Sequence, residues 1–136
     1  MYSVTKVFRI PIGHRLSKHQ GLCKNIHGHN FKIEVKISRK ELNENDMVID
    51  FSDLKKIVNG ILDNFDHALM LNSGDNVCVS SKTIYLKKDG VDPTAERLAE
   101  YLYNEIKQKF FFDELRVNSV RVWENDDSYA EYVEDQ

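Results

Sequence analysis

The chain has 136 residues, enough for one compact domain and too few for two, so we expect residues 1–136 to form a single domain. A net charge of −3 argues against a nucleic-acid-binding protein, because such proteins usually carry a strongly basic face. No apolar run is long enough to cross a bilayer, and the amino terminus lacks the apolar core of a signal peptide. We therefore expect a cytoplasmic protein that acts on a small molecule.

The first third of the chain predicts two strands, because every second residue in two runs is apolar or histidine. The face of the first run comprises Phe8, Ile10, Ile12, His14 and Leu16, and that of the second comprises His27, His29, Phe31, Ile33, Val35 and Ile37. If the two strands pair as an antiparallel hairpin, the end of the first lies beside the start of the second. This pairing would bring His14 close to His27 and His29.

Two amphipathic helices follow, each marked by apolar residues at spacings of three and four. Ser52 is the expected N-cap of the first, whose apolar stripe comprises Leu54, Ile57, Val58, Ile61, Leu62 and Phe65. The second begins near Pro93, with either Asp92 or Thr94 as its cap, and its stripe comprises Ala95, Leu98, Ala99, Leu102 and Ile106. Residues 110–112 would then return the chain to the core.

Two further strands are predicted at residues 117–124 and 129–133, joined by a polar turn that suits a hairpin. Between the helices, residues 73–91 indicate only short extended segments, at 77–79 and 84–86. The order is therefore two strands, two helices and two strands, which predicts an α+β domain.

The histidines indicate the chemistry. Residues two apart on a strand project to the same side, so His27 and His29 can bind one ion, and His14 would supply a third nitrogen. Three histidines leave a fourth position open for water or substrate, as in a catalytic Zn²⁺ site. Two alternatives stay open: the three histidines are unrelated, or Cys23 completes a closed structural site.

Five separated elements of the sequence also occur in the order of one family signature. They are His14, the run Cys23-x-x-x-His27-Gly28-His29, the pair Asp66-His67, the segment Pro93-Thr94-Ala95-Glu96, and Glu124. On these residues, and over most of its length, the chain resembles the 6-pyruvoyltetrahydropterin and 6-carboxytetrahydropterin synthases. The resemblance implies a T-fold, with a four-stranded antiparallel sheet and two helices between strands 2 and 3. It also implies a homo-oligomer, trimer or hexamer, with active sites between subunits.

The resemblance further implies roles for single residues. The three histidines would bind zinc, and Cys23 would act as general acid or base, with Asp66 and His67 as partners that keep its thiolate available. Glu124 would accept two hydrogen bonds from the amino-pyrimidine edge of a pterin.

The segment that begins the second predicted helix carries two further candidates for substrate binding. The resemblance implies that Thr94 and Glu96 contact the substrate. A helix cap and a first-turn carboxylate, however, explain both residues without any ligand.

The spacing between Cys23 and His27 bears on the reaction. The short Cys-x-x-x-His run resembles the bacterial and archaeal 6-carboxytetrahydropterin synthases. It implies a lyase that converts 7,8-dihydroneopterin triphosphate to 6-carboxytetrahydropterin, releases acetaldehyde and triphosphate, and serves the biosynthesis of queuosine and other 7-deazaguanines. The alternatives are triphosphate elimination that gives 6-pyruvoyltetrahydropterin, and a non-catalytic zinc-binding module.

Overall fold

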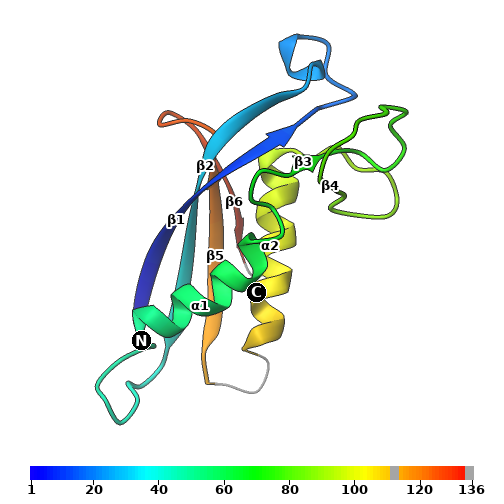
Figure 1. Cartoon of the computed structure of the whole chain (residues 1–136). Coiled ribbons are helices and arrows are strands. Elements are labelled where there is room, and N and C mark those ends of the chain that lie inside the picture. The colour runs from blue at the N-terminus through cyan, green and yellow to red at the C-terminus, as the bar shows by residue number, and fades with distance from the viewer. Residues whose placement is uncertain (111–113, 134–136) are drawn as a thin grey trace.

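The computed structural model describes residues 1–110 and 114–133. Within them, six strands form one curled sheet in the order β4-β3-β1-β2-β5-β6 (Figure 1). The strands are β1 (Tyr2–His14), β2 (His27–Arg39), β3 (Leu69–Met70), β4 (Thr83–Ile84), β5 (Arg116–Trp123) and β6 (Tyr129–Val133). The helices are α1 (Phe51–Leu62) and α2 (Ala95–Lys109), and a 3-10 turn, η1 (Leu22–Lys24), lies between β1 and β2.

The four long strands pair antiparallel, as the alternation of apolar residues predicts. β1 and β2 pair along their full length, from Tyr2 opposite Arg39 to His14 opposite His27. β5 pairs with β2 and β6 pairs with β5, both antiparallel. The two helices lie between the two hairpins in the chain, so this part of the predicted fold is confirmed.

The prediction of a sheet with only four antiparallel strands is wrong. β3 pairs parallel with the end of β1, at Gly13 and His14, and β4 pairs parallel with β3. Both added strands are two residues long, too short for alternation to be visible in the sequence. Of the two extended segments predicted between the helices, residues 77–79 form no strand, and the second is reduced to β4.

The helix caps correct one prediction and decide another. Asp50, not Ser52, caps α1, because its carboxylate accepts a hydrogen bond from the Ser52 N–H at 2.8 Å. The Ser52 hydroxyl donates to the same oxygen at 2.6 Å. Thr94 caps α2: its hydroxyl oxygen accepts from the Arg97 N–H at 3.1 Å. Asp92 therefore does not serve as the cap, and its carboxylate has other partners.

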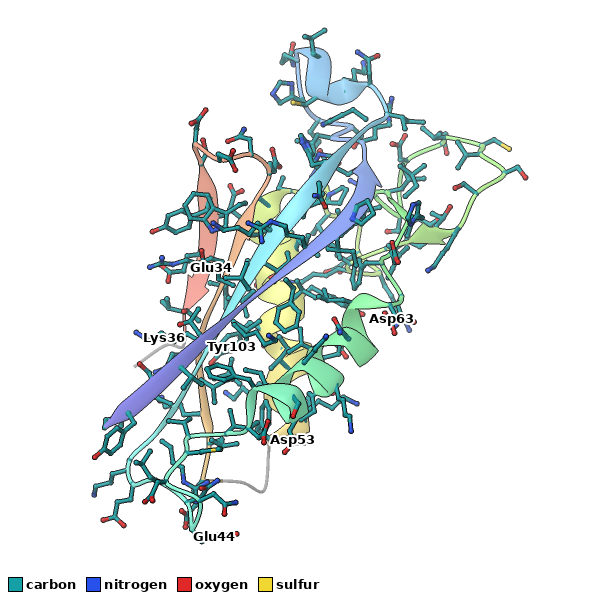
Figure 2. All side chains as sticks on the ribbon, turned by 60° about the vertical axis from the view of Figure 1, so that its left-hand side comes forward. Glu34, Lys36, Glu44, Asp53, Asp63 and Tyr103 are labelled. Atoms are coloured by element: carbon teal, nitrogen blue, oxygen red, sulfur yellow. The ribbon has the colours of Figure 1, made fainter. Side chains whose placement is uncertain are left out.

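The core lies between one face of the sheet and the two helices, with α1 against β1 and α2 against β5 and β6 (Figure 1). Its fully buried side chains include Phe31, Ile33, Val35, Leu54, Leu98 and Leu102. Glu34 and Lys36, labelled in Figure 2, alternate with these core residues and so belong to the opposite face. Phe110 is buried, as predicted, whereas residues 111 and 112 lie outside the described residues.

One end of the sheet gathers segments that are far apart in the sequence (Figure 1). The end of β1, the start of β2, η1, the short strands and the first turn of α2 all lie there. In the described part of the chain, no helix has both the length and the apolar character that a membrane span requires.

Candidate active site

Three histidines converge where β1 ends and β2 begins. His14 lies directly opposite His27 in the antiparallel pair, and His29 follows two residues later on the same strand. The ring centroid of His14 lies 4.5 Å from that of His27 and 5.0 Å from that of His29. One ligand nitrogen from each residue lies within 4.8 Å of the other two. The structure thus brings the three histidines together as the hairpin predicts.

Backbone carbonyls fix the orientation of two of these rings. The Nδ1–H of His14 donates to the Pro93 carbonyl at 2.9 Å, and that of His27 donates to the Asn25 carbonyl at 2.7 Å. Each ring then keeps its Nε2 lone pair for a metal, and histidine ligands commonly donate their other N–H in this way. No side-chain signal in the sequence could have identified these two carbonyls.

The spacing of the ligand nitrogens fits a single ion. The Nε2 atoms of His14 and His29 lie 3.1 Å apart. Two nitrogens that bind one tetrahedral zinc at about 2.0–2.1 Å are separated by about 3.3 Å. The donor set therefore suits a metal ion that prefers nitrogen ligands, and it leaves room for a further ligand.

Electrostatics also favour a metal over a proton at this site. His14 is completely buried, and burial lowers its pKa below the ordinary value. Its hydrogen bond to Pro93 and the nearby carboxylate of Glu124 oppose this shift, whereas His27 and His29 add to it. A neutral imidazole at neutral pH is the form that binds a metal.

One predicted substrate residue, Glu124, lies beside the histidines, and a second, Glu96, shares a hollow with it. The Oε2 atom of Glu124 lies 3.8 Å from the Nε2 atom of His29, at the point where β5 has just ended. Glu124 and Glu96 line the same hollow, which has a volume of about 380 Å³. Glu124 therefore lies next to the histidine cluster and shares with Glu96 a hollow that a small molecule can enter.

Thr94, in contrast, has a clear structural task. Because its hydroxyl caps α2, Thr94→Ala is expected to lower the free energy of unfolding by about 1 kcal/mol. Thr94→Ser keeps the hydroxyl and should retain most of that stability. Urea unfolding of the two variants measures the difference. An unchanged unfolding midpoint in Thr94→Ala would show that the capping hydrogen bond does not stabilise the protein.

The pair Asp66–His67 forms a fixed turn after α1. The His67 ring donates from Nδ1 to the Asp66 carboxylate at 2.6 Å, and His67 has a φ of 57°, which few residues other than glycine adopt. The backbone N–H of His67 donates to the Pro11 carbonyl, and the Lys82 ammonium donates to the Asp66 carbonyl. His67 is exposed and lines, with His27, a second hollow of about 620 Å³.

Cys23 lies on η1 and is half-buried. Among the described residues, the cluster able to hold a metal consists of the three histidines and does not include Cys23. This geometry does not support a closed site with a cysteine ligand. No hydrogen bond within the described residues joins the Cys23 thiol to Asp66 or His67, so the partnership of these three residues stays a prediction.

The sequence matches one known protein family along nearly its whole length. A sequence model of the 6-pyruvoyl tetrahydropterin synthase family matches residues 3–135. The chain belongs to this family. Its relatives include the 6-carboxy-5,6,7,8-tetrahydropterin synthases of Haemophilus influenzae, 36% identical over 98% of this chain and 100% of that protein, and of Rickettsia bellii, 34% identical over 96% and 99%.

The fold agrees with this family. The structure of 6-pyruvoyl tetrahydropterin synthase from Caenorhabditis elegans superposes with a TM-score of 0.74, at 24% identity, over 98% of this chain and 96% of that one. The T-fold implied by the sequence signature is therefore confirmed, apart from the two short parallel strands. Because tetrahydropterin synthases are lyases, the prediction of an enzyme of this class is also confirmed.

Proposed function

We propose that this chain is a zinc-dependent 6-carboxytetrahydropterin synthase. It would convert 7,8-dihydroneopterin triphosphate and water to 6-carboxytetrahydropterin, acetaldehyde and triphosphate. The observation that carries this proposal is the cluster of three histidines beside Glu124 in a chain whose relatives are named for the same product. We further propose a single-domain cytoplasmic enzyme that serves the biosynthesis of queuosine and other 7-deazaguanines.

In this proposal the histidine cluster holds the zinc ion. Once bound, the zinc would act as a Lewis acid toward the oxygens of the substrate side chain. The carbonyls of Pro93 and Asn25 hold His14 and His27 in the tautomer that presents Nε2. The burial of His14 keeps its ring neutral, so that a proton does not compete with the metal at neutral pH.

Cys23, Asp66 and His67 would move the protons. A free cysteine has a pKa of about 8.5, and a neighbouring imidazolium favours its thiolate form. Because Asp66 and His67 contact each other but no hydrogen bond joins the Cys23 thiol to either of them in the described part of one chain, we propose that the site is completed between subunits of a homotrimer or homohexamer. Among the described residues, β6 is the last strand on its side of the sheet, and β3 pairs with only two residues at the end of β1. The outer side of β6 and the remainder of β1 are therefore the places where another copy could add its strands.

Glu124 would orient the pterin. A carboxylate can accept two parallel hydrogen bonds, which suits the amino group and the ring N–H of a pterin. Glu96 lines the same hollow and is proposed as a further substrate contact. Thr94 keeps a hydroxyl hydrogen while its oxygen caps α2, so we propose it as a donor at the edge of this site.

The role of Glu124 leads to a binding prediction. Glu124→Gln is expected to keep the fold and the zinc and to weaken the binding of a pterin product by about 1.5–3 kcal/mol. Glutamine keeps the shape of glutamate but turns one acceptor into a donor, which would face donors on the ligand. Calorimetric titration of both proteins measures the change, and Asp126→Asn removes an exposed acid from the adjacent turn as a control. Equal affinity would leave Glu124 as an ordinary surface acid.

Product analysis tests the proposed reaction. The purified protein is incubated with 7,8-dihydroneopterin triphosphate, and the pterin, the aldehyde and the phosphate products are identified. 6-Carboxytetrahydropterin with acetaldehyde supports the proposal. 6-Pyruvoyltetrahydropterin without acetaldehyde would support the alternative, which is the reaction named in the family description. Zinc-loaded protein that leaves the substrate intact would indicate a binding module.

A further inference from the structure

The loop of residues 15–26, here called the Cys23 loop, has little packing to hold it. It joins β1 to β2 and connects the metal-binding candidates His14 and His27. None of its residues is buried, and Leu22 is 85% exposed. A loop without buried apolar side chains is expected to open easily unless polar contacts fix it. The position of Cys23 therefore depends on such contacts.

Asp75 supplies one of these contacts through Arg15. The Arg15 Nε–H donates to the Asp75 carboxylate at 2.7 Å, and the Asp75 side chain is only 8% exposed. The same guanidinium donates from Nη1 to the Lys24 carbonyl at 2.9 Å. Charge-assisted hydrogen bonds of this kind are stronger than neutral ones. Asp75 thus holds, through one arginine, the backbone next to Cys23.

Asp92 fixes the other end of the loop. Its Oδ1 accepts from the Ser17 hydroxyl at 2.6 Å and from the Ser17 N–H at 3.2 Å, and its Oδ2 accepts from the Lys18 N–H at 2.8 Å. The Asn72 amide also donates to Oδ1, at 3.0 Å. Burial raises the pKa of Asp92, but these hydrogen bonds outweigh it and hold the pKa below the ordinary value. The carboxylate is therefore charged when it holds the loop.

Both carboxylates belong to residues 73–92, the part of the chain to which the family signature assigns almost nothing. We propose that Asp75 and Asp92 are positioning residues, which hold the Cys23 loop so that the thiol stays in place for proton transfer. This proposal rests on the proposed function, because it takes Cys23 as the acid–base group. Neither carboxylate needs to touch the substrate.

The test compares variants of the full-length, zinc-loaded protein. All carry Cys78→Ser, so that Cys23 is the one remaining thiol of the two in the sequence. The variants are Asp75→Ala, Asp75→Asn and Asp92→Asn, and the control is Asp89→Ala, which removes an exposed acid from the same segment. The readouts are kcat, KM, zinc content, and the pH dependence of Cys23 alkylation by iodoacetamide.

We expect the Asp75 and Asp92 variants to lose at least about ten-fold in kcat, because a small displacement of a catalytic group is costly. KM and zinc content should stay unchanged, and the alkylation profile of Cys23 should shift, while the control matches the parent protein. An unchanged alkylation profile overturns the proposal, whether or not kcat falls. A shifted profile with normal kcat also overturns it, as does loss of zinc or of the fold in the conservative asparagine variants.

The outcome for the parent protein separates this proposal from the proposed function. If the parent protein does not convert the pterin, the proposed function is wrong. If the parent turns over normally and the Asp75 and Asp92 variants do so too, only the positioning role is wrong.

Discussion

His29→Ala is expected to remove the bound metal and to abolish activity. His29 supplies one of three ligand nitrogens, and its Nε2 lies 3.1 Å from that of His14. Two remaining histidines are too few to hold an ion in a catalytic zinc site. His27→Ala should behave in the same way, since its ring completes the same cluster. Both side chains lie near the end of the sheet and are not fully buried, so the fold should survive their loss.

Metal analysis of the purified variants measures this effect directly. The parent protein should carry one zinc per chain and the two variants close to none. His19→Ala is the matched control, because this exposed histidine lies outside the cluster and its ring accepts a hydrogen bond from the nearby Gly21 N–H. Full zinc occupancy in His29→Ala and His27→Ala would show that the metal, if present, is bound elsewhere.

Cys23→Ala has the second largest expected effect. It should lower kcat without changing the zinc content. If Cys23 is a general acid or base, its loss should lower kcat by about 10²–10⁴-fold and leave zinc in place. Zinc should stay bound because the metal-binding cluster among the described residues consists of histidines and does not include Cys23. Cys78→Ala, which alters the exposed second thiol, should leave both properties unchanged.

Zinc affinity decides between the two roles of Cys23. If Cys23 were a zinc ligand in a closed structural site, replacing it would lower the affinity of the protein for zinc. Competition with a chelator, compared between Cys23→Ala and the parent protein, measures that change. Loss of zinc together with activity would favour the structural site.

The histidine cluster could be predicted because strand geometry leaves few choices. Alternation places His27 and His29 on one side of β2, and antiparallel pairing with the preceding strand brings the end of β1 to that point. A long pairing with a buried face also fixes the register, since a slip of one residue would expose the whole core. His14 therefore lies opposite His27 for reasons that the sequence contains.

Other features depend on signals that a sequence does not carry. Asp50 and Ser52 are both typical helix caps two residues apart, and the choice between them depends on which backbone N–H is accessible. The carbonyls of Pro93 and Asn25 orient two histidines, yet every residue has a carbonyl. The sequence indicates Asp92 only as a possible helix cap, because its hydrogen-bond partners Ser17 and Asn72 lie 20 or more residues away in the chain.

The most direct test of a zinc-dependent lyase is to restore activity with the metal itself. Metal-free protein is mixed with 7,8-dihydroneopterin triphosphate, Zn²⁺ is added in steps, and the formation of acetaldehyde is followed. We expect no acetaldehyde without zinc, a linear rise in rate, and a plateau at one zinc per chain. Mg²⁺, which prefers oxygen ligands, should not replace it. Full turnover by the metal-free protein, or no acetaldehyde from the fully loaded protein, would contradict the proposed function.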